Sequence, residues 1–195
     1  DVLINNAGVG AAGSFVGTDL QTWNWAIDIN LKGVIHGCHY FVPKMVERKR
    51  GHVVNVASLA GLVAARRMSV YATTKFAVVG FSEVLRAELE PEGIGVTTLC
   101  PGVIDTPITR TAKHTGDLAA QPEYRRASME AYRQRRYGPQ RVAAAIVEAV
   151  RENKGLLPVS PESWLFYYMK RFAPGVAARV LNHDSLQPKP KTAAS

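Results

Sequence analysis

Short β-rich runs alternate with longer helical patterns along this chain. Four runs are apolar at nearly every position: 2–6, 52–57, 95–100 and 156–159. Such runs are typical of parallel strands that have helices on both faces of the sheet. Apolar residues recur at helical spacing in three segments: about 19–48, 70–90 and 138–153. The alternation predicts an α/β chain with a Rossmann-like, doubly wound parallel sheet of about four strands and flanking helices.

Proline and glycine predict where several of these helices begin, end or deform. Pro91 and Gly93 end the 70–90 pattern, and Gly138-Pro139 opens the 138–153 pattern. Pro43 lies inside the 19–48 pattern. Because proline removes a backbone hydrogen bond and crowds the preceding turn, it predicts a kink or a break there.

The second half of the chain contains a connection too long for a simple turn. Residues 103–137 are expected to hold a helix near 118–136 and to form a substrate loop, because long insertions between sheet elements are commonly binding lids. Residues 161–181 are expected to be a helical extension and 182–195 a flexible tail. The aromatic and basic stretch 164–172 either lines a roomy pocket or packs in the core or between subunits, which we slightly favour.

Composition agrees with one globular domain, since 47% of the 195 residues are hydrophobic. No apolar run reaches the length of a membrane span, and no signal segment opens the chain. The first residue is Asp1, directly before an apolar run, so we interpret the sequence as a fragment. Cys38 and Cys100 lie far apart in apolar stretches. We therefore expect buried thiols in a cytoplasmic compartment, with no disulfide and no metal site.

The net charge of +8 permits a nucleic-acid partner. Much of the excess lies in 110–141, where no recognition motif accompanies it and the tyrosines follow no base-stacking pattern. A solvated helical face is the preferred explanation, and attraction of an anionic cofactor or substrate is the second. We expect no nucleic-acid partner.

Residues 8–13 spell G-x-G-x-x-G directly after a predicted strand, which is the pattern of a dinucleotide phosphate loop. That loop must open directly into a helix whose N-terminus faces the phosphates. Here residues 14–17 intervene, and no acidic residue ends a second strand about 20 residues on, as the ribose contact requires. We favour the alternative that these glycines let the backbone pass close to a ligand.

Three predicted strand ends carry small or polar residues at one sheet edge. Ser58 follows the second strand, although a serine there is commonly just a turn or cap residue. Tyr71 and Lys75 stand four apart at the start of a helix and so share one face. A nearby ammonium lowers a phenol's pKa, which suits proton exchange near neutral pH. Each signal is weak alone, and their agreement is the stronger argument.

Taken together, these elements resemble the short-chain dehydrogenase/reductase family from residue 1 to about 159. The matching elements occur in family order: Asn5-Asn6-Ala7-Gly8, Asn30, Ser58, Tyr71-Ala72-Thr73-Thr74-Lys75, Pro101-Gly102 and Thr106. The resemblance implies an NAD(P)-dependent enzyme that moves a hydride between a small-molecule alcohol and a carbonyl. It makes residues 1–181 a partial catalytic domain and implies homo-oligomers.

The resemblance also implies a role for each catalytic residue. Tyr71 is the acid in reduction and the base in oxidation, and Ser58 hydrogen-bonds the substrate oxygen. Lys75 lowers the pKa of Tyr71 and holds the nicotinamide ribose. Asn30 binds a water in a proton relay, with a polar residue in a helix bend as the competing interpretation.

The family pattern also marks residues that border the cofactor. They are Asn6, Ala7, Gly8, Tyr71, Lys75, Pro101, Gly102, Ile104 and Thr106. Of these, Ile104 and Thr106 would meet the nicotinamide. Thr106 could equally be a helix cap ahead of Pro107.

The chain departs from the family pattern at its front. The family's first strand, its Thr-Gly-x-x-x-Gly-x-Gly phosphate loop and its cofactor selector do not occur in these 195 residues. NAD and NADP therefore stay open. We expect these residues alone to be inactive, with 2–6 as an association-prone edge strand.

Two other classes of function stay open besides a reductase. One is a non-catalytic binding or regulatory module, against which the intact Asn, Ser, Tyr and Lys set argues. The other is a nucleic-acid-binding protein. For an enzyme, we expect a bulky or apolar substrate.

Overall fold

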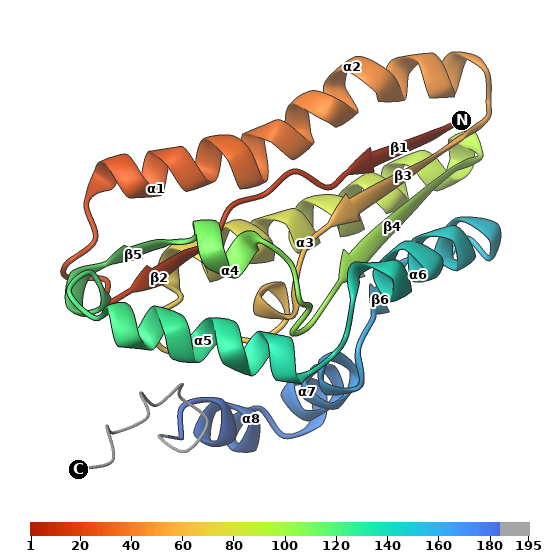
Figure 1. Cartoon of the computed structure of the whole chain (residues 1–195). Coiled ribbons are helices and arrows are strands. Elements are labelled where there is room, and N and C mark those ends of the chain that lie inside the picture. Colours follow the sequence, from red (N-terminus) through yellow and green to blue (C-terminus); the bar gives the residue numbers. More distant parts are fainter. Residues whose placement is uncertain (184–195) are drawn as a thin grey trace, which may run out of the picture.

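The structure is a computed structural model that describes residues 1–183 (Figure 1). Most of the tail predicted at 182–195 lies outside the described residues. At the centre is one parallel sheet in the order β1-β3-β4-β6. Its strands are β1 (Val2–Asn5), β3 (Gly51–Val56), β4 (Ile94–Cys100) and β6 (Leu156–Pro158). The four predicted strands and the α/β fold class are thus confirmed.

The first helical region is three consecutive elements rather than one helix. Helix α1 (Leu20–Ile27) is capped by the Asp19 carboxylate, which accepts a hydrogen bond from the Thr22 N–H at 2.7 Å. A π-helical segment, η1 (Asp28–Lys32), then leads into α2 (Gly33–Glu47). Of the kink or break predicted at Pro43, the break is wrong, since Pro43 lies within α2, and the kink stays a prediction. The irregular turn falls instead at η1, which holds the buried Asn30.

Helices cover both faces of the sheet, as a doubly wound arrangement requires (Figure 1). On one face, α2 and α3 (Ser69–Leu89) pack over a core that includes Cys38, Val53 and Val96. On the other, α6 (Pro139–Arg151) lies against β3 and β4. Both cysteines are buried free thiols, as predicted.

Strand β1 forms one edge of the described sheet. Its Leu3 packs into the core, but Val2 and Ile4, which point to the opposite face, are 50% and 47% exposed. A run of alternate apolar side chains is therefore open on that face. This agrees with the expectation that the first strand is an edge with a partly bare surface.

The long connection folds as several short elements and one helix. They are α4 (Ile108–Thr111), β5 (Lys113–Thr115), η4 (Gly116–Leu118) and α5 (Pro122–Gln134). Strand β5 pairs in parallel with β2 (Ala11–Gly13), forming a second small sheet that the sequence pattern does not predict. We call β5, η4 and α5 the lid.

The glycine-rich segment does not open into a helix, so the phosphate-loop interpretation is unsupported. Gly13 has a φ of +152°, and a side chain there would collide with the Thr115 carbonyl. A side chain on Gly17 would likewise strike Gly116. Gly13 and Gly17 therefore let the backbone pass close to the lid. The expectation for the glycines of residues 8–13 was a close approach to a ligand instead.

The remaining elements complete the fold around the strand ends. Two 3-10 turns, η2 (Leu59–Gly61) and η3 (Glu90–Glu92), flank α3. The C-terminal helices are α7 (Pro161–Phe172) and α8 (Pro174–Leu181), which pack against each other. Among the described residues, no helix has the length and apolar character needed to cross a membrane.

Candidate active site

Ser58 leaves the carboxyl end of β3 in extended conformation and begins η2. Its Oγ accepts a hydrogen bond from the Ala60 N–H at 3.1 Å, so the serine is a cap. Its hydroxyl also lies close enough to the Tyr71 hydroxyl to lower the pKa of that phenol. The cap role and the pairing with Tyr71 are therefore both present, and neither excludes the other.

Tyr71 and Lys75 lie in the first two turns of α3, on the face that meets Ser58. The Lys75 ammonium is 5.8 Å from the centre of the Tyr71 ring. Lys75 is only 3% exposed, and its Nζ donates to the carbonyl of Val56, the last residue of β3, at 2.9 Å. The structure therefore brings Ser58, Tyr71 and Lys75 together at one edge of the sheet, as predicted from their spacing.

Burial dominates the acid–base properties of this pair. Loss of solvent raises the pKa of Tyr71 to about 12, although the hydrogen bond with Ser58 opposes the rise. Loss of solvent also lowers the pKa of Lys75 to about 8. Lys75 is not among the causes that shift the pKa of Tyr71, so the expectation that it lowers this pKa stays a prediction. Loss of solvent is the largest cause of the Tyr71 shift, and the Lys75 ammonium donates to the Val56 carbonyl.

Asn30 is fully buried in η1 and connects two parts of the site. Its Oδ1 accepts from the Val9 N–H at 2.8 Å, and its Nδ2 donates to the Val9 carbonyl at 3.0 Å. The same Nδ2 donates to the Thr74 hydroxyl at 3.1 Å. The amide therefore ties the loop after β1 to α3. This supports a positioning role in a helix irregularity, and the predicted water relay is untested.

The loop after β1 runs past the buried amine. A Cβ on Gly8 would lie 3.4 Å from Lys75 Nζ and 3.3 Å from Asn30 Oδ1, so a side chain there would crowd both groups. Asn6 and Ala7 are exposed, and within residues 1–183 the Asn6 side chain has no hydrogen bond. The neighbouring Asn5 instead donates to the buried Asn55 side chain at 2.8 Å.

The loop after β4 is the third strand end at this edge. The Pro101 carbonyl accepts from the Leu59 N–H at 2.7 Å, which fixes the loop beside η2. Gly102 lies against the Ser160 and Ser163 hydroxyl groups, and Ile104 is 6% exposed. Thr106 is not a helix cap, because the N-cap of α4 is Pro107. That alternative for Thr106 is therefore wrong.

The lid places an aromatic residue beside Tyr71 that our sequence argument did not single out. Tyr132 of α5 lies near enough for its charge to affect the pKa of Tyr71. Tyr124, Ser128 and Tyr132 are spaced four apart, which puts them on one face of α5. This spacing is visible in the sequence, but nothing in it says which surface the face meets.

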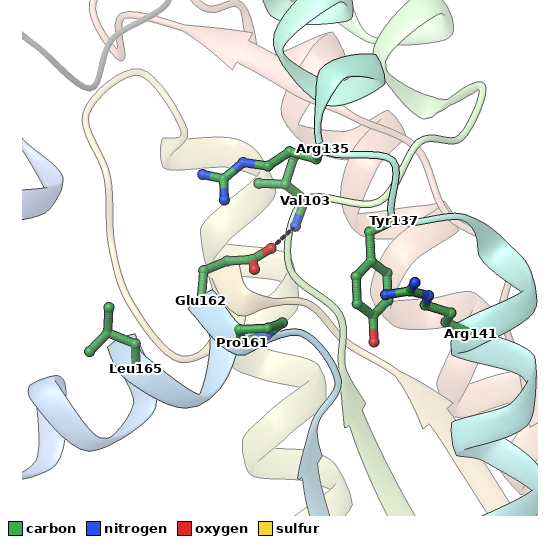
Figure 2. A pocket seen from close by; sticks show the side chains of 7 residues that line it. All are labelled: Val103, Arg135, Tyr137, Arg141, Pro161, Glu162 and Leu165. Carbon is green, nitrogen blue, oxygen red and sulfur yellow. Dashed lines mark hydrogen bonds between the residues drawn. The ribbon is translucent and has the colours of Figure 1, made fainter.

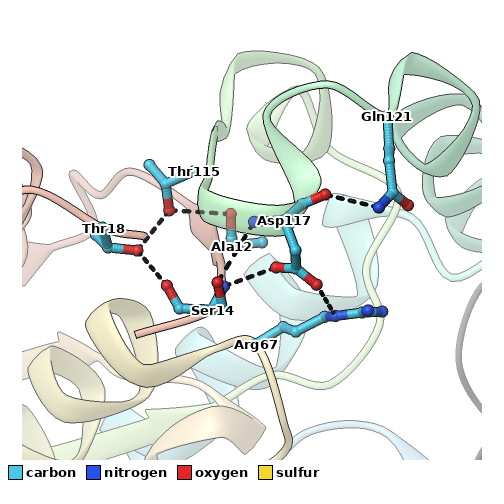
Figure 3. Close-up of polar contacts among 7 residues, drawn as sticks. All are labelled: Ala12, Ser14, Thr18, Arg67, Thr115, Asp117 and Gln121. Atoms are coloured by element: carbon cyan, nitrogen blue, oxygen red, sulfur yellow. Dashed lines mark hydrogen bonds and ion pairs between the residues drawn. The ribbon is translucent and has the colours of Figure 1, made fainter. Parts of the chain in front are cut away.

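A polar cluster holds the lid against the segment between β2 and α1 and against the turn before α3 (Figure 3). Asp117 of η4 accepts from the Ser14 N–H at 2.9 Å and pairs with Arg67 Nε at 2.7 Å. Thr18 and Thr115 share a hydrogen bond of 2.7 Å beside it. We call Ser14, Arg67 and Asp117 the lid latch. It joins three segments that lie far apart in the sequence.

The electrostatics of the latch favour a charged Asp117. Partial burial raises the pKa of this carboxyl, but the Ser14 N–H and the Arg67 guanidinium outweigh it and hold the pKa below its ordinary value. Arg67 also lies 5.9 Å from the centre of the Tyr124 ring. The arginine therefore contacts both η4 and α5. Among the described residues, no cluster of acidic, histidine or cysteine side chains could hold a metal.

Comparison with known proteins agrees with this arrangement. The family model described as short chain dehydrogenase matches residues 1–117. The chain belongs to the short-chain dehydrogenase/reductase family. It is 42% identical over 178 residues to the "Probable oxidoreductase EphD" of Mycobacterium tuberculosis, an alignment that covers 89% of this chain and 30% of that protein. The chain thus spans about a third of this relative.

Solved structures of the family share the fold. A short-chain dehydrogenase from Streptomyces avermitilis superposes with a TM-score of 0.75 at 27% identity, covering 90% of this chain and 66% of that chain. A family member from Burkholderia phymatum, in complex with NAD, gives 0.73 at 28% identity and covers 100% of this chain and 69% of that chain. These likenesses show that the chain shares the fold of the family.

Replacing Lys75 by methionine should reveal the depressed pKa of the buried amine. A lysine with a folded pKa of about 8, against 10.5 as its ordinary value, leaves the unfolded chain with more protons between these pH values. Stability from this group should therefore rise with pH across that window, by about 1 kcal/mol per pH unit at most. Chemical denaturation of both proteins from pH 7 to 11 measures this. If the difference in unfolding free energy between wild type and variant does not change with pH, the lowered pKa of Lys75 is contradicted.

Replacing Asp117 by asparagine should loosen the lid while leaving the core intact. The variant keeps an acceptor for Ser14 but loses the charge that pairs with Arg67. We expect a loss of at most about 1 kcal/mol, because the pair is partly exposed. Hydrogen exchange should speed up at Lys113 and Gly116, whose N–H groups donate to Gly10 and Gly17.

Asp28→Asn is the matched control, because Asp28 forms an exposed ion pair with Lys32 of 2.7 Å on another part of the chain. Equal exchange rates at Lys113 and Gly116 in both variants and the wild type would show that the latch does not hold the lid.

Proposed function

We propose that this protein interconverts an alcohol and a carbonyl group, with Tyr71 as the proton donor and acceptor. The observation that carries the proposal is that Ser58, Tyr71 and Lys75 meet at one edge of the sheet, with the Ser58 hydroxyl near the Tyr71 phenol and the Lys75 ammonium 5.8 Å from the Tyr71 ring. The Ser58 hydroxyl at the end of β3 and the Tyr71 hydroxyl on α3 can both contact the same substrate oxygen. Ser58 would bind that oxygen and Tyr71 would exchange its proton.

The raised pKa of Tyr71 favours the acid role. With a pKa of about 12, the residue is a neutral phenol near pH 7 and can donate a proton to a developing alkoxide. Ser58 can stabilise the same oxygen as negative charge builds. For oxidation, Tyr71 must act as a base, which requires its pKa to fall.

The residues at this edge fit a nicotinamide cofactor, which would supply the hydride when bound. Lys75 offers a buried amine that suits ribose hydroxyl groups, and Gly8 leaves its Nζ approachable. The exposed Asn6 and Ala7 precede Gly8 in the loop after β1. The loop 101–106 follows β4 at the same carboxyl edge of the sheet. We propose that Pro101, Gly102, Ile104 and Thr106 face the nicotinamide. The choice between NAD and NADP stays open.

We also propose a substrate class, an assembly and a location. Tyr132 and Tyr124 give the lid an aromatic face, which suits a bulky or apolar substrate. Exposed Tyr40 and Phe41 on α2 and Phe76 on α3 fit a homo-oligomer interface, which light scattering would test. Buried free thiols fit a cytoplasmic protein, and fractionation of cells would test this.

We further propose that these 195 residues need the family's phosphate-binding half for activity. Val2 and Ile4 lie half exposed on the edge strand, where that half would pack. Calorimetry with NADH and NADPH on the 195 residues should detect no binding. Micromolar binding by a monomer would show that we have misplaced the cofactor loop. Below, the complete enzyme means these residues joined to that half.

In the complete enzyme, Tyr71→Phe should lower turnover by at least about a hundredfold, the usual contribution of a positioned acid or base. NADH affinity should stay close to that of the wild type, because only the proton-transferring hydroxyl is lost. Steady-state kinetics and calorimetry measure the two effects.

Val84→Thr is a suitable control, because Val84 is exposed on the same helix and is not among the proposed interface residues. Turnover in Tyr71→Phe within a few-fold of the wild type would refute the assignment.

A further inference from the structure

A cavity lies where three helix ends meet the loop after β4 (Figure 2). It is open to solvent and has a volume of about 470 Å³. Seven residues line it: Val103, Arg135, Tyr137, Arg141, Pro161, Glu162 and Leu165. Arg135 follows α5, Arg141 lies in the first turn of α6, and Glu162 lies in the first turn of α7.

The charge of this cavity is not balanced. Arg135 and Arg141 lie on opposite sides of it (Figure 2), and within residues 1–183 neither guanidinium pairs with a carboxylate. Arg141 instead stacks over Tyr137 at 5.0 Å. The one acid present, Glu162, already accepts from the Val103 N–H at 2.9 Å. The arginine donors are therefore free to bind an anion.

The cavity continues onto an apolar helix face. Val103, Pro161 and Leu165 form its apolar wall. Beyond Leu165, which is 56% exposed, Tyr168 and Phe172 are 50% and 78% exposed and stack on each other. Positions 165, 168 and 172 share one helix face, and at 1.5 Å per residue they span about 10 Å.

We propose that this cavity and the adjoining face of α7 bind a single-chain amphiphile with a carboxylate head. The head lies between Arg135 and Arg141, and the chain lies along Leu165, Tyr168 and Phe172. The stripe accommodates an alkyl chain of about eight carbons. Because the arginines border a recess between three elements, the site admits a monomer rather than a bilayer surface. This site goes beyond the proposed reaction and requires neither Tyr71 nor the cofactor.

Calorimetry on the complete enzyme tests the site with decanoate, decanol and acetate as probes. Decanoate should bind, whereas decanol lacks the charge and acetate lacks the chain, so both should bind at least about tenfold more weakly. Arg141→Gln should weaken decanoate binding about tenfold, the loss expected for one charge-assisted hydrogen bond. Arg126→Gln, an exposed arginine elsewhere on α5, should change nothing.

Leu165→Ser provides a second, independent variant. It should weaken decanoate binding and leave the weaker acetate binding unchanged, since it removes only a chain contact. The proposal is overturned if decanoate affinity is the same in Arg141→Gln and wild type, or if decanol binds as tightly as decanoate. Binding to vesicles of anionic phospholipid with no binding of monomeric decanoate would also overturn it, in favour of a membrane surface.

Discussion

The buried amide of Asn30 is the constraint on which the site depends. An amide without solvent must place its hydrogen bonds within the protein, because each unsatisfied group costs about 1–3 kcal/mol. Asn30 does so with both backbone groups of Val9 and with the Thr74 hydroxyl. These partners belong to the loop after β1 and to α3. The amide thereby sets the distance between Gly8 and the buried end of Lys75.

Burial then decides the character of the groups at this edge. The Tyr71 phenol is held in its neutral form, and Lys75 titrates only slightly above neutral pH. Near pH 7 the edge therefore carries a hydroxyl pair and an ammonium, which are all hydrogen-bond donors. A donor-rich edge suits electron-rich oxygens, such as those of a carbonyl group or a ribose. The lid completes this environment, since Tyr132 and the latch keep α5 close to α3.

Much of this arrangement is readable in the sequence because it is local. Apolar runs located the four strands, and spacing alone put Tyr71 and Lys75 on one helix face. Contacts between distant segments were not readable. The pairing of β2 with β5 has no local signal, because each strand has only three residues. The direction in which the pKa of Tyr71 moves depends on which distant segments bury the side chain. The departure from α-helix at Asn30 rather than Pro43 likewise reflects tertiary hydrogen bonds.

The latch has a consequence for how substrate preference can change in this fold. Ser14 and Asp117 are 103 positions apart in the chain, and the parallel pairing of β2 with β5 spans a similar distance. Gly13 and Gly17 fit against the backbone of that same lid strand and turn. A lid transplanted from a relative would meet a mismatched surface unless residues 11–18 and Arg67 came with it. A lid can therefore be exchanged only together with residues 11–18 and Arg67, which lie far from it in the sequence. We expect the lid and residues 11–18 to vary together among relatives.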